Sequence, residues 1–400
     1  MRAVDFLLET VSHFARRVQG PPPGVPFHAD AEFETSLVST CQHQMLSALV
    51  SESFDELALP PSISRITIAR IKHYAGVSAE FRQRRMQLAG RIATAFSDQG
   101  IRAAFLGDVW IASDPELLGR LRPLGRIDVM IDETRWMEAV AVLRNLGFFR
   151  SRIQPRIADS ADALRYHQYY SPLMMHNHDG DTVELRFRVI DFGNPGRENH
   201  AWSRVTESEI AGTKTAVVSV EDQLIHSVIS FGAEGFVDLL LVLDAGWLLD
   251  RHVATLDWKY LTRRLYDRGL YSAFYFTLEL VCELLRFPMT IPQLDPPAGW
   301  QRRLFHVWWR PREANYAGET EPTAGRFVWG LVESGGLASR MLWLHRALFP
   351  RRSWVRSVYG RPANLWLCLK FLHDVRSGRR RRAADLEDQQ GDVTDFNRSH

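Results

Sequence analysis

Residues 122–132 read RPLGRIDVMID, and this stretch decides how the chain is interpreted. An Arg-Pro turn and a glycine lead into the apolar run 127–131, which carries one carboxylate, Asp128. Because residues two apart on a β-strand share a face, an acidic residue two positions before Asp128 would complete a metal-binding pair. Arg126 stands there instead. The pattern therefore predicts a phosphate-transfer site in which a cation replaces one metal ligand.

The composition of the chain is that of a globular protein. Its 400 residues are 46% hydrophobic and 24% charged, which is enough for more than one hydrophobic core. The formal net charge is only +2, so no global field attracts nucleic acid, which is not expected as a partner. Three scattered cysteines favour reduced thiols and a cytoplasmic protein. No apolar run reaches the roughly 18 residues that span a bilayer, so no transmembrane segment is expected.

Changes in residue pattern divide the chain into four parts. Apolar residues at helical spacing predict an N-terminal helical region over residues 1–85. Short apolar runs and glycine turns predict an α/β core with a small mixed sheet over residues 86–200. Long apolar helices predict a C-terminal helical domain over residues 201–376, followed by a disordered polar tail over residues 377–400. The expected fold class is therefore α+β, with helical regions on both sides of the core.

Within this frame, apolar periodicity and the Gly and Pro breakers indicate where the elements lie. Helices are expected over residues 31–53, 61–99 and 133–146. Strands are expected over residues 101–106, 127–131 and 148–153, and in a hairpin of residues 169–175 and 182–190 around Asp179-Gly180.

The carboxylates and the glycine turn follow the needs of nucleotidyl or phosphoryl transfer. Such reactions use a divalent metal held by carboxylates, because the charge on the transferred phosphate must be neutralised. Asp128 and Glu184 lie on two expected strands and are the candidate ligands for Mg²⁺, which prefers oxygen. The turn at Gly107 and Asp108 opens a helix whose N–H groups can approach phosphate. Arg126 is the third candidate catalytic residue.

The order of these pieces resembles the uncharacterised nucleotidyltransferase family, a branch of the polymerase-β-like nucleotidyltransferase superfamily. The matching pieces lie between about residues 86 and 290 and are Leu106-Gly107, Arg122-Pro123-Leu124-Gly125-Arg126-Ile127-Asp128, Glu184-Leu185-Arg186-Phe187, Glu221-Asp222-Gln223-Leu224, Leu241-Val242-Leu243-Asp244 and Leu256-Asp257-Trp258. The resemblance implies metal-dependent transfer of a nucleotidyl group from an NTP to an acceptor, which is a peptide, a saccharide or a small molecule. His167 falls where the family often has a histidine, and with Gly107, Asp108 and Arg122 it is a candidate for binding nucleotide.

Three residues depart from the family pattern, and all three concern the chemistry. Leu106 stands where a lysine is expected, Arg126 replaces the first Asp of the pair, and Arg186 replaces a histidine. A cation beside a metal position is unfavourable, since two like charges about 4 Å apart repel by about 4 kcal/mol at intermediate dielectric. Two interpretations stay open. Either Arg126 pairs with Asp128 or Glu184 and the site is inactive, or Arg126 binds phosphate in place of a metal.

The sequence is therefore compatible with three classes of function. The first is a nucleotidyltransferase that uses Mg²⁺ and NTP, with activity weakened by the degenerate motif. The second is a catalytically inactive nucleotide-binding or scaffold protein of the same fold. A third is an adaptor that binds a membrane surface or nucleic acid through the aromatic and basic residues between positions 308 and 356, although such residues more often form a core beneath a solvated arginine face.

Overall fold

The computed structural model describes most of the chain up to residue 305. The described residues are 3–16, 30–56, 63–151, 154, 160–169, 172–190, 199–287, 294–299, 301–303, 305 and 366–370. The tail predicted at residues 377–400 and the aromatic and basic region at residues 308–356 lie outside them. Predictions for both segments stay predictions.

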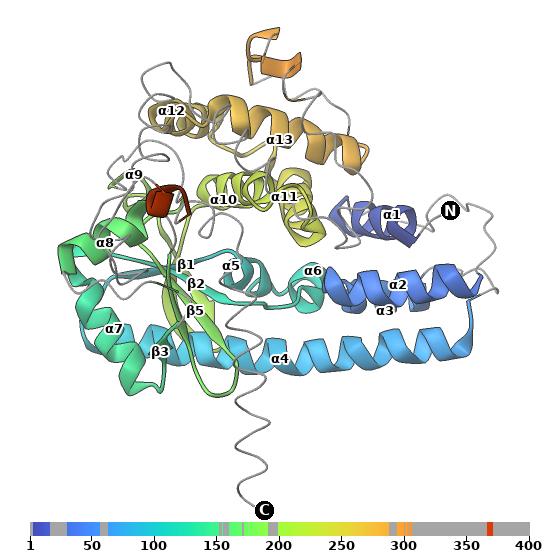
Figure 1. Cartoon of the computed structure of the whole chain (residues 1–400), viewed down its shortest axis with the longest axis horizontal. Coiled ribbons are helices and arrows are strands. Elements are labelled where there is room, and N and C mark those ends of the chain that lie inside the picture. Colours follow the sequence, from blue (N-terminus) through green and yellow to red (C-terminus); the bar gives the residue numbers. More distant parts are fainter. Residues whose placement is uncertain are drawn as a thin grey trace, which may run out of the picture.

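Within the described residues, a seven-stranded mixed sheet forms the centre of the molecule (Figure 1). Its strands are β1 (Ala103–Leu106), β2 (Ile127–Ile131), β3 (Phe149–Arg150), β4 (Leu173–His176), β5 (Thr182–Arg186), β6 (Thr206–Ile210) and β7 (Thr213–Val217). Their order is β3-β4-β5-β2-β1-β7-β6. Strand β2 lies in the middle, antiparallel to β1 and parallel to β5, so the candidate site residues on all three strands are neighbours.

Helices enclose the sheet. Those of the N-terminal half are α1 (Ala3–Ala15), α2 (Ala31–His43), α3 (Ser47–Glu56), α4 (Arg65–Asp98), α5 (Asp108–Ala112), α6 (Leu117–Leu121), η1 (Glu133–Arg135), α7 (Trp136–Asn145) and α8 (Ser160–Tyr169). The later ones are α9 (Asn199–Trp202), α10 (Val220–Ala233), α11 (Leu239–His252), α12 (Trp258–Arg268) and α13 (Tyr271–Leu284). In Figure 1, the long α4 runs below the sheet and below α1–α3, whereas α10–α13 lie above the sheet. Among the described helices, none is both long enough and apolar enough to cross a lipid bilayer.

Alternate residues of the strands pack into two different hydrophobic cores, because successive side chains of a strand point to opposite faces. Phe105 and Val129 pack into the core that contains buried residues of α4 and α7. Leu106 and Met130 pack into the other core, which contains the apolar residues of α10–α13 and of the N-terminal helices. Asp128, two residues before Met130 on β2, shares that second face of the sheet.

Most predicted elements are confirmed, and the fold class is confirmed as a mixed sheet with flanking helices. The single helix expected over residues 31–53 is wrong, since α2 ends at His43 and Met45 has a positive φ of 56° before α3 begins. Of the strand expected over residues 148–153, Phe149–Arg150 forms, residues 148 and 151 do not belong to it, and residues 152–153 lie outside the described residues.

The sheet also extends past the predicted core. Strands β6 and β7, which the sequence patterns did not reveal, follow residue 200 and pair with each other and with β1. Their alternating Thr, Glu and Ser residues are half-exposed, so they carry little apolar signal. The boundary at residue 200 stays a prediction, although the sheet continues beyond it.

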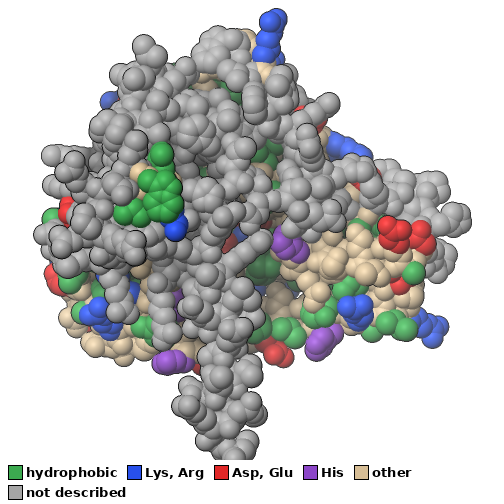
Figure 2. Space-filling model, viewed as in Figure 1, with side chains coloured by type: hydrophobic (Ala, Val, Ile, Leu, Met, Phe, Trp, Pro, Cys, Tyr) green, Lys and Arg blue, Asp and Glu red, His purple; other side chains and the backbone are tan. Residues whose placement is uncertain are grey.

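Charged side chains of both signs lie on the face of the molecule that Figure 2 shows. On the face that Figure 2 shows, Lys and Arg side chains are interspersed with Asp and Glu side chains along the described helices. This agrees with the formal net charge of +2 and shows no large field of one sign among the described residues of that face.

Candidate functional site

Strand pairing brings the two candidate carboxylates together. In the parallel pair of β2 and β5, Asp128 lies opposite Glu184, and Met130 lies opposite Arg186. In the antiparallel pair of β1 and β2, Leu106 lies opposite Asp128, so the turn at Gly107 begins beside the same carboxylate. The residues predicted to act together therefore meet at one place on the sheet.

Two arginines bind these two carboxylates. Arg186 donates from Nε to Asp128 Oδ1 at 2.7 Å and from Nη2 to Glu184 Oε2 at 2.7 Å. Arg126 donates from Nε to Asp128 Oδ2 at 3.1 Å, and the same nitrogen lies 3.7 Å from Glu184 Oε2. We call these four residues the sheet cluster. Both oxygens of Asp128 thus accept a hydrogen bond from a guanidinium group.

The members of the sheet cluster differ in exposure. The side chains of Asp128, Glu184 and Arg186 are buried, whereas that of Arg126 is 34% exposed. Burial alone would raise the pKa of Asp128, but Arg186 and Arg126 hold that pKa well below its usual value. Burial, reinforced by the charge of Asp128, raises the pKa of Glu184. The cluster is thus a compensated set of buried charges with one edge open to solvent.

Gly107 allows the close approach of the β1 turn to Asp128. Its φ is 63°, and a Cβ at this position would lie 2.9 Å from Asp128 Oδ2, so a side chain is excluded both by backbone conformation and by space. The Gly107 N–H donates to Gln223 Oε1 at 2.9 Å. The turn has the expected geometry, but this N–H, a candidate for binding phosphate, already has a protein partner.

His226 completes the surroundings of Asp128, and sequence reasoning missed it. Helix α10 begins at Val220 because Ser219 Oγ accepts the N–H of Asp222, and His226 follows on the buried helix. Its Nδ1 lies 3.2 Å from the carbonyl oxygen of Val189, so we assign the proton to Nδ1. Burial first, and then the nearby Arg186 and Arg126, lower the pKa of His226 to about 4. The imidazole is therefore neutral at pH 7.

The sequence contains a weak signal for the roles of Gln223 and His226. Gln223 and His226 are three residues apart in a buried helix, so they lie on one face and can both reach the end of β1. Only the packing of α10 against the sheet shows that this face meets Gly107 and Asp128.

A second arginine–carboxylate group lies beside the sheet cluster. The Arg122 guanidinium donates to Asp244 from Nε at 2.8 Å and from Nη2 at 2.9 Å, and Nη2 also lies 2.8 Å from Asp108 Oδ1. Asp108 Oδ2 accepts the N–H of Gly125 at 2.9 Å and that of Arg126 at 3.4 Å. We call Asp108, Arg122 and Asp244 the tether group, because it joins α5, the turn before β2 and α11.

These contacts bear on the nucleotide-binding roles predicted for Asp108 and Arg122. The Arg122 side chain is 2% exposed, and its Nη1 donates to the carbonyl oxygen of Pro123 at 2.6 Å. Burial raises the pKa of Asp244 to about 6 despite the opposing effect of Arg122. Binding to phosphate stays a prediction for Arg122 and Asp108, and their contacts indicate a structural task.

His167 lies in another environment. It belongs to α8 and is buried, and its Nε2 lies 2.9 Å from Nη2 of Arg150 on the β3 side of the sheet. Its predicted help in positioning phosphate stays a prediction.

The donor set around Asp128 does not fit a divalent metal. Mg²⁺ requires oxygen ligands at about 2.0–2.1 Å in octahedral geometry. Both oxygens of Asp128 and Oε2 of Glu184 face guanidinium nitrogens instead. In the part of the chain that the structure describes, no three His, Cys, Asp or Glu side chains form a group that could hold a metal ion.

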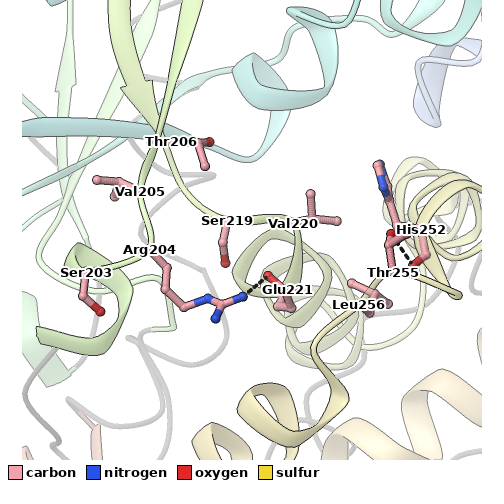
Figure 3. A pocket seen from close by; sticks show the side chains of 10 residues that line it. All are labelled: Ser203, Arg204, Val205, Thr206, Ser219, Val220, Glu221, His252, Thr255 and Leu256. Carbon is pink, nitrogen blue, oxygen red and sulfur yellow. Dashed lines mark hydrogen bonds and ion pairs between the residues drawn. The ribbon is translucent and has the colours of Figure 1, made fainter.

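A separate hollow of about 420 Å³ lies at the N-terminal end of α10 (Figure 3). It is lined by Ser203, Arg204, Val205, Thr206, Ser219, Val220, Glu221, His252, Thr255 and Leu256. Arg204 Nη2 lies 3.3 Å from Glu221 Oε2 at its edge, and Arg204 Nη1 donates to Asp257. None of the predicted site residues lines this hollow, and its charged groups are already paired with each other.

A protein-family model matches more than half of the chain. The chain belongs to the uncharacterised nucleotidyltransferase family, whose model matches residues 32–286. The resemblance inferred from the sequence motifs is thereby confirmed, and the match reaches further toward the N-terminus than the motifs do.

Other comparisons add little. One similar solved structure is the crystal structure of an antigenic nucleotidyltransferase-like protein from Paracoccidioides brasiliensis, with 10% identity and a TM-score of 0.30. The match covers 54% of this chain and 97% of that one. No curated protein matches the chain.

Proposed function

We propose that this protein is a catalytically silent member of the nucleotidyltransferase family that binds nucleotide without a divalent metal. The observation that carries the proposal is the sheet cluster, in which two guanidinium groups take the contacts that metal ions would need. Family membership supports a nucleotide as the ligand. Metal-dependent transfer is disfavoured by the same contacts.

The energetic argument concerns the buried partners. A metal ion that reached Asp128 and Glu184 would have to displace Arg186, whose side chain is 7% exposed. Breaking a buried ion pair by removing one partner costs about 3–5 kcal/mol, because the other charge stays uncompensated. Mg²⁺, which loses its water ligands reluctantly, has little to offset that cost.

Arg126 is the residue through which a nucleotide would be bound. It is the most exposed member of the sheet cluster, at 34%, and its guanidinium fork suits two phosphate oxygens at once. Because Arg186 would continue to pair with both carboxylates, Arg126 can turn toward a ligand while each carboxylate keeps one guanidinium partner. The positive charge that a metal supplies to a triphosphate would then come from the protein.

Calorimetric titration of ATP tests the proposal. We expect equal affinity within about threefold in Mg²⁺ and in EDTA, and about tenfold weaker binding by Arg126→Ala, which corresponds to one charge-assisted contact. Arg263→Ala, a change at an arginine that is 76% exposed on α12, is the matched control and should bind like the wild type. Absence of ATP binding would overturn the proposal.

A second candidate is metal-dependent nucleotidyl transfer to a peptide, saccharide or small-molecule acceptor. The observation in its favour is that Asp128, Glu184 and the Gly107 turn keep the layout expected of an active site. Its test is Mg²⁺-dependent release of pyrophosphate from ATP in the presence of mixed acceptors, with Asp128→Asn as control. Release that the control abolishes would establish this candidate in place of the first.

A further inference from the structure

We infer that Arg186, and not Arg126, is the residue that keeps a divalent metal out of this site. The sequence motif draws attention to Arg126, because that residue replaces the first Asp of the expected pair. The hydrogen bonds of Asp128 and Glu184 indicate Arg186 instead. The inference deepens the proposed metal-independence and rests on it, but its test needs no nucleotide.

Arg186 occupies the position between the two carboxylates. Its Nε and Nη2 each lie 2.7 Å from an oxygen, one of Asp128 and one of Glu184, so a single guanidinium bridges both groups. A metal shared by the two carboxylates would lie between those same oxygens. Arg126 approaches from the side, at 3.1 Å and 3.7 Å, with a third of its side chain in solvent.

The backbone fixes this arrangement. Glu184 and Arg186 are two residues apart on β5 and share a face, and β5 pairs in register with β2, which carries Asp128. The side chain of Arg186 therefore begins beside the carboxylates on a buried strand and has no solvent to turn into. Arg126 precedes the first residue of β2 and reaches the cluster from its edge.

The net charge of the sheet cluster and the position of Arg186 are two explanations of metal exclusion. They predict opposite results for Arg126→Asp, so an experiment can distinguish them. In the sheet cluster the two arginines balance the two carboxylates. Arg126→Asp would leave Arg186 with three carboxylates, a net charge of −2, whereas Arg186→Gln would leave Arg126 with two, a net charge of −1. If charge decides, Arg126→Asp attracts a divalent cation more strongly. If the position of Arg186 decides, Arg126→Asp does not attract the cation more strongly, because the added carboxylate binds Arg186 more firmly.

The experiment is a titration of each full-length variant with Mn²⁺, followed by the paramagnetic resonance signal of the free ion. Mn²⁺ takes the same oxygen ligands as Mg²⁺. We expect the wild type and Arg126→Asp to bind no better than Arg263→Ala, the surface control. Arg186→Gln should bind at least tenfold more tightly than these, and Arg126→Asp/Arg186→Gln more tightly still. Arg186→Lys, which keeps a buried cation, should exclude Mn²⁺ like the wild type.

A thermal readout covers variants that fold poorly. Removing Arg186 leaves two buried carboxylates without their main partner, so these variants should melt at lower temperature, and Mn²⁺ should raise their midpoint by binding the folded state. Arg126→Asp keeps Arg186, and it should show no such rise.

Two outcomes would overturn the inference. One is binding of Mn²⁺ by Arg126→Asp as tight as by the double variant, and the other is exclusion of Mn²⁺ by the double variant in its folded state. Either leaves the ATP titration unaffected. Conversely, a protein that binds no ATP would refute the proposed function without changing the Mn²⁺ result.

Discussion

The sheet cluster and the tether group are built from the same chemistry but respond differently to change. In the tether group, one buried arginine serves two carboxylates, Asp108 and Asp244. In the sheet cluster, two arginines share two carboxylates, and one of the arginines is partly exposed. In the tether group, loss of the one arginine removes the ion pairs of both carboxylates. In the sheet cluster, loss of one arginine leaves the other arginine beside the carboxylates.

The location of each group explains its task. The tether group connects elements far apart in sequence, since Arg122 and Asp244 are separated by 122 positions and lie in a loop and in α11. The sheet cluster lies on two adjacent strands and at the residue just before one of them, where the sheet hydrogen bonds already hold the backbone. We therefore interpret the tether group as structural and the sheet cluster as the site to which the proposed function belongs.

The largest expected effect is that of Arg122→Ala. It leaves Asp244 buried without its bidentate partner Arg122, and the free energy of unfolding should fall by about 3–5 kcal/mol. Urea denaturation followed by tryptophan fluorescence measures it. Arg263→Ala is the surface control and should leave the midpoint nearly unchanged. A loss no larger than that of Arg126→Ala would erase the distinction between the two groups.

The next effect is on the pH dependence of stability, through His226. In the folded state the pKa of this histidine is lowered to about 4, whereas in the unfolded chain it is near the ordinary value of about 6.5. Its contribution is therefore fully present above pH 6.5 and is lost as the pH falls to about 4, a change of about 3 kcal/mol.

The measurement is the free energy of unfolding against pH for the wild type and for His226→Gln. Asp244, whose pKa is raised to about 6, titrates in the same interval, and the difference between the two curves removes its contribution. A difference that does not vary between pH 6.5 and pH 4 would mean that His226 is not held neutral beside the sheet cluster.

A smaller effect is expected from Gly107→Ala. The φ of 63° at this position and the closeness of Asp128 Oδ2 to the added Cβ should together cost about 2 kcal/mol. Gly100→Ala is a matched control, since that residue has a similar φ of 64° but open space around its Cβ. The difference between their unfolding midpoints isolates the contact with Asp128, and equal midpoints would show that this contact is loose.

The smallest effect is expected from Arg126→Ala. Because Arg186 continues to pair with Asp128 and Glu184, and solvent screens the exposed Arg126, the loss of unfolding free energy should be about 1 kcal/mol. Denaturation under the conditions used for Arg122→Ala measures it. A loss above that of Arg122→Ala would reverse the roles assigned to the two groups.

Local pattern predicted the strands of the site well. The strand at residues 127–131 was predicted with the bounds it has, because four apolar residues and one carboxylate between a glycine turn and Asp132 admit few alternatives. Strands β6 and β7 were missed because their polar, half-exposed residues give no apolar alternation. The break between α2 and α3 was missed because Met45, an apolar residue with good helix propensity, adopts a positive φ in its tertiary setting.

The sequence by itself determined the family, the central strand and the positions of Arg126 and Arg186 near its carboxylates, since these depend on residue type and on spacing along the chain. Tertiary structure alone decided what the departures do. Pairing of β2 with β5 places Arg186 between Asp128 and Glu184, and packing of α10 adds His226 and Gln223. Long-range pairing sets which charges share a buried volume, and the energy of a buried charge depends on its nearest partners rather than on its neighbours in sequence.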